Sequence, residues 1–461
     1  MTGEPLDRVG RTPLVRVTTL DTGRCELFLK LESHNPGGSI KDRIGVSMIR
    51  AAERAGHLGP AQRRIVEATA GNTGLGLALA AAQRGYELTL VIPDKMSKEK
   101  ILHAKALGAT VVMTRSDVEK GHPAYYVDLA KRIARETGAY HPNQFENPAN
   151  PAAHEATTGP EIWEQTGGRL DAVVCGVGSG GTLTGLSRFF ARVAPTVEMV
   201  LADPVGSALA GFVNEGRASP LGSYLVEGIG QDRIPPICDL SRTRRAFSIP
   251  DREAFDVVQQ LLRREGILAG TSSGTLVAAA LRWCREQEAP RRVVTFVCDT
   301  GNKYLSKAFN EYWLLDQSLV EAPSFGDLRD FIGRARADVV SVAPDDTLGL
   351  AHSRMRMAEV SQLPVLEGER IVGILDESDL LLAVTQPGDG DAAERRASAF
   401  TRPVRAVMSS ELVTVPVSTA PQELLPLLDR GLVPIVVERG EFLGLVTRSD
   451  LLATLRRRAT L

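Results

Sequence analysis

The sequence of 461 residues lacks the features of several specialised classes of protein. Its five cysteines are scattered and include no CxxC pair, so we expect reduced thiols in the core. The net charge of -2 provides no field to attract nucleic acid or an anionic membrane. The opening "MTGEPLDRVG" is no basic and apolar targeting signal, and the apolar run Leu75–Ala82 is too short to cross a bilayer. We therefore expect a cytoplasmic protein with no nucleic-acid or membrane partner.

The first two thirds of the chain alternate short β-rich runs with longer helical patterns. This alternation predicts an α/β fold with a parallel sheet covered by helices on both faces. Ligands of such sheets gather at the carboxyl ends of the strands. The expected strands are "RRIVEAT", "ELTLVIP", "TVVMT", "DAVVCGV", "VEMVLADP" and "VVTFVCD".

The last third contains a weak internal repeat. The segment "VSVAPDDTL…LPVLEGERIVGILDESDLL" (340–381) is echoed by "VTVPVSTAP…VPIVVERGEFLGLVTRSDLL" (413–452), with the polar linker "QPGDGDAAERRASAFT" between them. Because one copy alone has little core, we expect the two copies to pack together. The expected organisation is a first domain at 1–322, a linker at 323–333 and repeats at 334–386 and 403–461.

Lys41 occupies an unusual position, directly after the glycine turn of "NPGGSIKDRIG" and at the start of a helical pattern. The helix macrodipole disfavours an ammonium group there. Either Lys41 is solvated, as most lysines are, or its pKa is lowered enough for its amine to attack a carbonyl and form a Schiff base.

A second glycine turn, "EATAGNTGLGLALAAA", joins a strand to an apolar helix. Its amides and the Asn72 side chain are suited to hold a carboxylate or a ring oxygen at the helix start. The alternative is that Asn72 simply caps the helix.

A third turn, "CGVGSGGTLTG", offers a nest of amides at Gly178–Thr182 for a phosphate. It also satisfies the G-x-G-x-x-G pattern of a dinucleotide site through Gly176, Gly178 and Gly181, with Asp203 at the end of the next strand. Taken alone, this motif favours a nicotinamide oxidoreductase.

The combination of motifs points elsewhere. "GGSIKDRIG", "TAGNTGLGLALA", "GVGSGGTLTG", "LVEGIGQDRIP" and "EGILAGTSSGT" occur in the order seen in pyridoxal-phosphate enzymes of the tryptophan-synthase β-like fold. Over roughly residues 6–315 the chain resembles the cystathionine β-synthase family within that group. Its repeat resembles the tandem CBS-type regulatory domains (a Bateman module) of the same family.

The resemblance implies a role for each motif. Lys41 would be the lysine that forms the internal aldimine with pyridoxal 5'-phosphate, Asn72 would bind the 3' oxygen of its ring, and Ser272 would face the pyridine nitrogen. Ser272 is otherwise a plausible helix cap. The cofactor phosphate would bind Gly178, Ser179, Gly180, Gly181 and Thr182, and the substrate carboxylate would bind Thr69, Ala70, Gly71, Asn72 and Thr73.

The implied reaction is a β-replacement that joins L-serine, or O-acetylserine, with L-homocysteine through an aminoacrylate intermediate to give L-cystathionine, as in transsulfuration. Glu227 would act in catalysis by meeting the amino group of the second substrate; otherwise it is a surface carboxylate. The alternatives are a cysteine synthase (O-acetylserine sulfhydrylase) that uses sulfide and, more remotely, a nucleotide-sensing protein with a degenerate enzyme domain.

The sequence departs from the family pattern at two positions. Ala70 stands where many relatives have serine, and Asp376 replaces the usual threonine in the first repeat. Only Thr447 and Asp450 then match the pattern that holds the ribose of an adenosyl ligand, which predicts one such site per chain. We further expect a homodimer that contains neither haem nor a metal.

Overall fold

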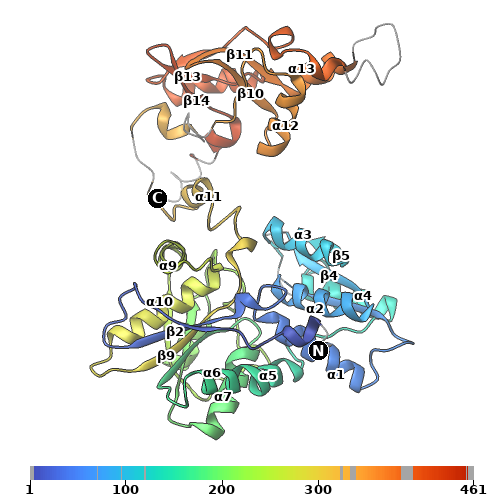
Figure 1. Ribbon diagram of the computed structural model, residues 1–461, viewed down its shortest axis with the longest axis vertical. Coiled ribbons are helices and arrows are strands. Elements are labelled where there is room, and N and C mark those ends of the chain that lie inside the picture. Colours follow the sequence, from blue (N-terminus) through green and yellow to red (C-terminus); the bar gives the residue numbers. More distant parts are fainter. Residues whose placement is uncertain are drawn as a thin grey trace. The chain divides into compact units, whose positions relative to one another are not determined.

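The computed structural model describes residues 5–69, 71–94, 96–118, 121–321, 325–332, 339–385, 398–452 and 454. They belong to two compact units, Met1–Trp313 and Leu314–Leu461, which are drawn in Figure 1. Helix α11 (Glu311–Asp316) contains the boundary between them. None of the helices described has the length and the hydropathy that a bilayer crossing requires.

The first unit is built on two sheets. In the larger one β1 is antiparallel to β2, and the remaining neighbours are parallel. Its order is β1 (Leu14–Arg16), β2 (Glu26–Leu31), β9 (Arg292–Val297), β6 (Ala172–Gly176), β7 (Glu198–Pro204) and β8 (Thr243–Ile249). The smaller sheet is parallel and consists of β3 (Arg64–Ala68), β4 (Glu87–Pro93) and β5 (Thr110–Thr114).

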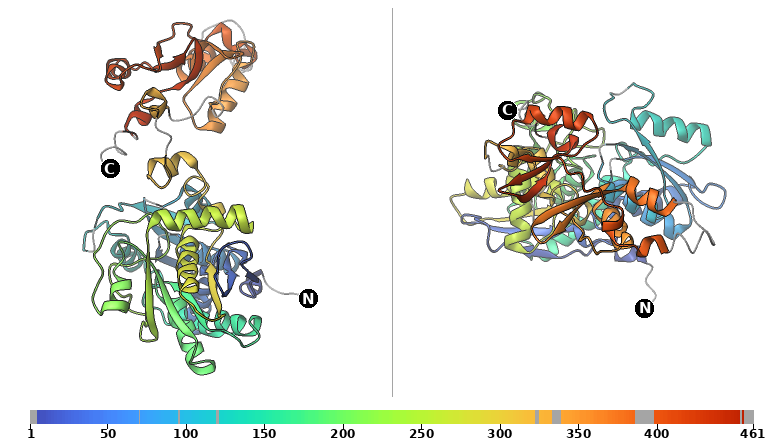
Figure 2. Two further views of the ribbon diagram at one scale, coloured as in Figure 1. Left: turned by 90° about the vertical axis from the view of Figure 1, so that its left-hand side faces the viewer. Right: turned by 90° about the horizontal axis from the view of Figure 1, so that it is seen from above.

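All six strands expected from the sequence are present, and the parallel arrangement is confirmed. The central strands are continuous apolar runs because helices cover the larger sheet on both sides. Figure 1 and Figure 2 show α9 (Asp251–Glu265) and α10 (Thr271–Arg285) over one face, and α5 (Ala149–Ala153), α6 (Gly159–Gln165) and α7 (Gly181–Val193) beyond the other. Helix α8 (Leu209–Glu215) follows β7, and α3 (Lys98–Ala106) and α4 (Tyr126–Thr137) belong to the smaller sheet.

Helices α1 (Lys41–Arg54) and α2 (Asn72–Arg84) touch backbone to backbone. A Cβ atom on Gly45 would lie 2.4 Å from the carbonyl carbon of Gly76, and one on Gly76 would lie 2.5 Å from the carbonyl oxygen of Lys41. Side chains at these two positions would force the helices apart. The glycines therefore bring the first turn of α2 against the start of α1, where Lys41 lies.

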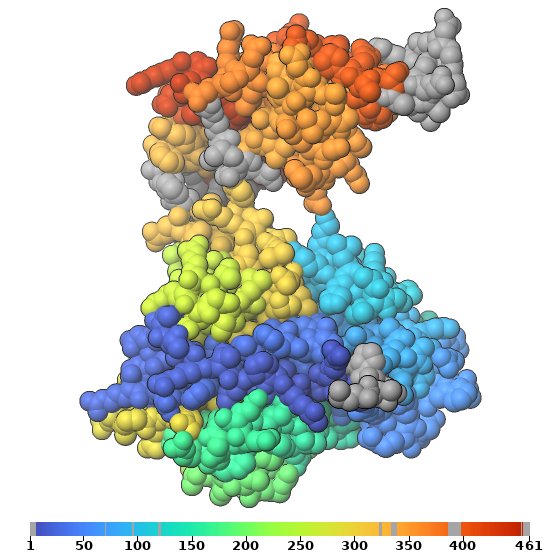
Figure 3. Space-filling view, in the orientation of Figure 1, coloured from blue at the N-terminus to red at the C-terminus, as the bar shows by residue number. Residues whose placement is uncertain are grey.

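The N-terminal segment runs across one face of the first unit, shown in blue beside the green segment of α5–α7 in Figure 3. Buried charges fasten it there. Arg43 pairs with Glu32 at 2.7 Å and with Glu161 at 2.7 Å, and Lys30 pairs with Glu161 at 2.8 Å. Since each buried charge has an opposite partner, the network fixes α1 against β2 and α6.

The second unit contains the two repeats, each with an antiparallel hairpin. The first repeat has α12 (Leu348–Ala358), β10 (Gln362–Glu367), β11 (Arg370–Asp376) and α13 (Glu377–Thr385). The second has β12 (Thr414–Pro416), α15 (Leu425–Asp429), β13 (Ile435–Glu438) and β14 (Glu441–Leu445). Both hairpins are bulged at equivalent places, and Ile371, Ile435 and Phe442 join the two repeats in one buried cluster. The expected packing of two copies is confirmed.

Candidate active site

Lys41 is the first residue of α1, as expected, and it is partly buried. Burial lowers the pKa of its amine, although Cys298 and Asp299 act in the opposite direction. These two residues directly follow β9, at the carboxyl end of the larger sheet. An amine that loses its proton readily is the form that attacks a carbonyl carbon.

The side chain of Asn72 does not cap α2, so the alternative interpretation of this residue was wrong. Asn72 is the first residue of the helix, and the residue that precedes it, Gly71, has no side chain to cap it. Asn72 Nδ2 donates to Asp299 Oδ2 at 2.6 Å, and Lys303 Nζ donates to Asn72 Oδ1 at 2.9 Å. Asp299 therefore links Asn72 to the environment of Lys41.

The loop Gly178–Thr182 leads from β6 into α7, and its backbone N–H groups donate no hydrogen bond within the described part of the chain. Gly180 has the positive φ of 91° that the turn requires. A Cβ atom on Gly181 would lie 1.8 Å from Asn150 Oδ1, so only glycine fits there. Unpaired amides at a helix start form an anion site of the size of a phosphate group.

Two buried side chains, those of Asn150 and His154, make hydrogen bonds to this loop. Asn150 Nδ2 donates to Ser179 Oγ at 2.9 Å, while Asn150 Oδ1 is buried without a partner among the described residues. Thr182 Oγ1 lies 3.2 Å from His154 Nε2. Burial, with help from Lys41, holds the pKa of His154 well below its usual value, so the ring is neutral. His154 therefore interacts with Lys41 electrostatically and with Thr182 of this loop by a hydrogen bond.

The dinucleotide interpretation fails at Asp203. This carboxylate is fully buried, and its Oδ2 accepts the backbone N–H of Ala210 at 2.8 Å at the start of α8. The carboxylate accepts a hydrogen bond within the protein interior and is not placed at the surface to bind a ribose. The G-x-G-x-x-G pattern therefore occurs here without its acidic partner.

Ser272 is the second residue of α10 and is buried. Gly270 precedes the helix and no side chain caps it, so the cap interpretation was wrong here too. The Ser272 hydroxyl interacts with the Cys298 thiol, which in turn lies near Lys41. Ser272 and Lys41 thus both interact with the same cysteine.

The loop expected to bind the substrate carboxylate lies between β3 and α2. Thr69 Oγ1 accepts the N–H groups of Gly71 at 3.1 Å and Gly74 at 3.2 Å, and Thr73 Oγ1 donates to Gln144 Oε1 at 2.7 Å. Both threonines shape the loop from inside. Ala70 lies outside the described residues.

Glu227 is not a surface carboxylate, because only 8% of the residue is exposed. Its Oε2 accepts from Lys100 Nζ at 2.6 Å and its Oε1 from Lys307 Nζ at 2.7 Å. Burial raises the pKa of Glu227, but the two ammonium groups outweigh it and hold the pKa below its usual value. Glu227 is therefore ionised and doubly paired.

A hydrogen-bonded chain that the sequence did not reveal connects Glu227 to Asn72. Lys100 Nζ donates to Tyr304 Oη at 2.9 Å, and Tyr304 Oη donates to Asp299 Oδ2 at 2.6 Å. A signal for Asp299 and Tyr304 was available, since "DTGNKY" follows a strand whose carboxyl end should face the site. Nothing in the pattern marked Lys100, which lies in an ordinary helical segment.

In the second unit, Thr447 and Asp450 are in contact: Asp450 Oδ2 accepts Thr447 Oγ1 at 2.6 Å and Thr447 N–H at 2.8 Å. In the first repeat, Asp376 and Asp379 exchange equivalent backbone bonds of 3.0 and 2.8 Å. Asp376 therefore makes the backbone hydrogen bonds that threonine makes in the second repeat, but it adds a second carboxylate. Burial and the charge of Asp376 raise the pKa of Asp379.

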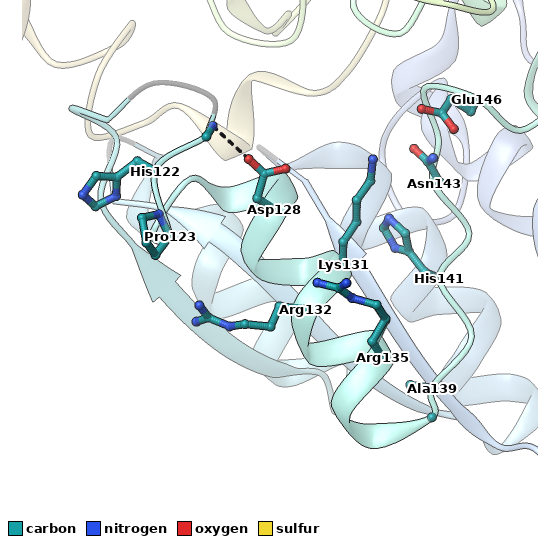
Figure 4. A pocket seen from close by; sticks show the side chains of 13 residues that line it. His122, Pro123, Asp128, Lys131, Arg132, Arg135, Ala139, His141, Asn143 and Glu146 are labelled. Atoms are coloured by element: carbon teal, nitrogen blue, oxygen red, sulfur yellow. Dashed lines mark hydrogen bonds between the residues drawn. The ribbon is translucent and has the colours of Figure 1, made fainter.

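A hollow of about 1000 Å³ lies elsewhere on the first unit, over α4. Figure 4 shows Lys131 and Arg135 of α4 and His141 of the following segment along it. Its lining contains none of the described residues that we predicted for the site. No group of three or more His, Cys, Asp or Glu side chains in the described ranges could hold a metal ion.

The arrangement fits pyridoxal phosphate, because a partly buried lysine with a lowered pKa, an amide nest with no partner among the described residues and a fixed Asn72 amide lie within one unit. Comparisons with known proteins agree. Residues 6–299 match the family model described as "Pyridoxal-phosphate dependent enzyme", and residues 328–386 and 404–457 match "CBS domain". Together they define a pyridoxal-phosphate enzyme of the tryptophan-synthase β-like fold with a CBS-domain pair.

The chain is 33% identical to cystathionine beta-synthase of Dictyostelium discoideum, over 98% of this chain and 91% of that protein. It is 37% identical to the Oryctolagus cuniculus cystathionine beta-synthase, over 83% and 72% respectively. The chain therefore belongs to the family of pyridoxal-phosphate-dependent β-replacement enzymes that includes these cystathionine β-synthases.

Two solved structures are also similar. A hydrogen sulfide-producing enzyme from Fusobacterium nucleatum has a TM-score of 0.61 and 34% identity, covering 66% of this chain and 100% of its own. An O-ureido-L-serine synthase has a TM-score of 0.62 and 33% identity, covering 71% and 98%.

Proposed function

We propose that this protein joins L-serine or O-acetylserine with L-homocysteine to give L-cystathionine. The observation that carries the proposal is the placement of Lys41 at the start of α1, where its partly buried side chain interacts electrostatically with Cys298, Asp299 and His154. Lys41 Nζ would hold the cofactor, take the proton from the α carbon of the first substrate and later return it.

The residues around Lys41 would divide the remaining tasks. Pyridoxal phosphate, when bound, supplies the electron sink for carbanion chemistry. The amides of Gly178–Thr182 would bind its phosphate, the amide of Asn72 would bind the 3' oxygen of its ring, and Ser272 would face the ring nitrogen. A hydroxyl stabilises a protonated ring nitrogen less well than a carboxylate, which favours β-replacement over transamination.

The loop of residues 69–73 would hold the carboxylate of the first substrate. Its N–H groups lie at the start of α2, where the macrodipole favours an anion. Thr69 accepts the N–H groups of Gly71 and Gly74, and Thr73 donates to Gln144, so these described residues of the segment are held by hydrogen bonds within the protein.

Homocysteine as the thiol is supported by the relatives that match along most of the chain, both of which are named cystathionine beta-synthase. The competing assignment, a cysteine synthase, would use sulfide as the thiol; one similar structure is described as hydrogen sulfide-producing, so sulfide is a product there. A nucleotide sensor with a degenerate enzyme domain is opposed by the intact surroundings of Lys41 and the open amide nest.

A competition assay decides between the two thiols. The holoenzyme is given serine, and separately O-acetylserine, with homocysteine and sulfide at equal concentrations, and the products are identified by mass spectrometry. We expect cystathionine to predominate with at least one first substrate. Cysteine as the main product in both reactions would favour the cysteine synthase.

We further propose that the CBS-domain pair serves mainly to hold a homodimer together in the cytoplasm. It also offers one adenosyl site at Thr447 and Asp450, where the hydroxyl and the carboxylate lie side by side. Activation requires a ligand to bind two states of the enzyme unequally, so occupancy of this site would not by itself imply regulation.

A further inference from the structure

We propose that Lys100 and Lys307 form the subsite for the carboxylate of the incoming thiol amino acid, with Glu227 as a positioning residue between them. The inference rests on the proposed function, because it concerns the second substrate of that reaction. It replaces the role implied by the family resemblance, in which Glu227 itself meets the substrate ammonium group.

Glu227 is poorly placed to accept another cation. Each of its carboxylate oxygens already accepts from a different ammonium group, at 2.6 Å from Lys100 and 2.7 Å from Lys307. The backbone N–H of Glu227 donates to Thr271 Oγ1 at 3.0 Å and fixes the residue further. A substrate ammonium would become the third positive charge on one buried carboxylate, or would have to displace a lysine.

The same three side chains favour an anion. Two ammonium groups share the single carboxylate of Glu227, in a place where only 3% of Lys100 and 8% of Glu227 is exposed. Buried charge is stable only when it is compensated. An ammonium group has three donors, and Lys100 uses two of them within the described residues, on Glu227 and Tyr304.

The position of the lysines identifies the second substrate as the source of that anion. Lys100 lies against the loop that would hold the first substrate: a Cβ atom on Gly71 would be 2.9 Å from Lys100 Cδ and 3.4 Å from its Nζ. The Lys307 side chain is 21% exposed and is the most open member of the group. The two lysines therefore lie between the segment that would hold the first substrate and the partly exposed side chain of Lys307.

The chemistry of homocysteine allows a direct test with two analogues. 4-Mercaptobutanoate keeps the carboxylate and lacks the amino group, whereas 3-aminopropane-1-thiol keeps the amino group and lacks the carboxylate. With the wild-type holoenzyme and a saturating first substrate, we expect kcat/KM for the mercaptobutanoate to exceed that for the aminothiol by roughly tenfold or more. The reverse order would assign Glu227 to the ammonium group and overturn the proposal.

Variants provide the second readout. Lys307→Gln should lower the ratio of kcat/KM for 4-mercaptobutanoate to that for sulfide by about tenfold, mainly through KM of the mercaptobutanoate, because sulfide has no carboxylate to bind. Lys307→Arg, which keeps the charge, should restore most of the ratio. The matched control is Lys105→Gln, an exposed lysine further along α3, which should leave the ratio unchanged.

The outcomes separate the subsite from the function. One outcome is that Lys307→Gln turns over sulfide and homocysteine with the wild-type ratio of kcat/KM for 4-mercaptobutanoate to that for sulfide. That result would leave the β-replacement intact and overturn the subsite. A higher KM for the first substrate alone would assign the lysines to that substrate and also overturn the proposal. Failure of every thiol with both serine and O-acetylserine would overturn the proposed function together with the subsite.

Discussion

Replacement of Gly181 by alanine tests the phosphate loop without removing any functional group. Gly181 is the first residue of α7, and a Cβ atom there would lie 1.8 Å from Asn150 Oδ1. Asn150 is fully buried, and its Nδ2 donates to the carbonyl of Gln144 at 2.8 Å and to Ser179 Oγ at 2.9 Å. Either this amide or the start of α7 must move to relieve the overlap.

The cost follows from the hydrogen bonds that the displacement breaks. At about 1 kcal/mol each, two hydrogen bonds amount to about 2 kcal/mol, and a misplaced amide nest adds to this loss. A loss of about 2–3 kcal/mol in cofactor binding corresponds to an affinity weaker by roughly 30- to 150-fold.

The affinity is measured by titrating apoprotein with pyridoxal phosphate and following the visible absorption band. Circular dichroism serves as the check on folding. The control is Gly59→Ala, since an added Cβ at Gly59 meets no atom within 4 Å and the residue has no positive φ. Affinity of Gly181→Ala within about threefold of the wild-type value, well below the expected loss, would refute the assignment of this loop to the cofactor.

Three further predictions concern other parts of the chain. Burial lowers the pKa of Lys303 from 10.5 to about 8, so between pH 8 and 10.5 the unfolded chain binds more protons than the folded one, and the free energy of unfolding should rise with pH. Lys303→Met should reduce this rise by up to about 3 kcal/mol in urea titrations at pH 8, 9 and 10. An unchanged pH dependence in Lys303→Met would show that Lys303 is not its cause. A protein of residues 1–322 should fold, bind pyridoxal phosphate and turn over, because every proposed catalytic residue lies within it; an insoluble or cofactor-free product would make the second unit part of the catalytic core. Calorimetry with S-adenosylmethionine, ATP and AMP should find at most one adenosyl site per chain, and Asp450→Ala should abolish it; two equivalent sites would show that the first repeat binds as well.

Local patterns were sufficient to predict the core of the first unit. Parallel strands are short apolar runs bounded by turns; β3, β4, β6, β7 and β9 are mostly buried runs of this form, and the edge strand β5 is an apolar run that is only partly buried. Strand β2 was missed because a lysine interrupts it. Lys30 is fully buried there only because it pairs with Glu161, which lies 131 residues further along the chain.

The candidate site likewise contains residues that the sequence marks and partners that it does not. Lys41, Asn72 and the loop Gly178–Thr182 follow glycine turns, and these turns are visible in the sequence. The partners that fix them are not, since Asn72 and Asp299 are 227 residues apart and Lys100 and Tyr304 are 204 apart. Such pairs form only when the fold brings distant strand ends and helix starts together.

The central claim is that Lys41 carries the cofactor, and borohydride reduction tests it most directly. Reduction of the wild-type holoenzyme, followed by digestion and mass spectrometry, should place the pyridoxyl group on the peptide that contains Lys41. Lys41→Ala should keep its fold, still bind cofactor through the phosphate loop, lose turnover and yield no reduced adduct. A reduced adduct on another lysine, or turnover by Lys41→Ala, would contradict the account.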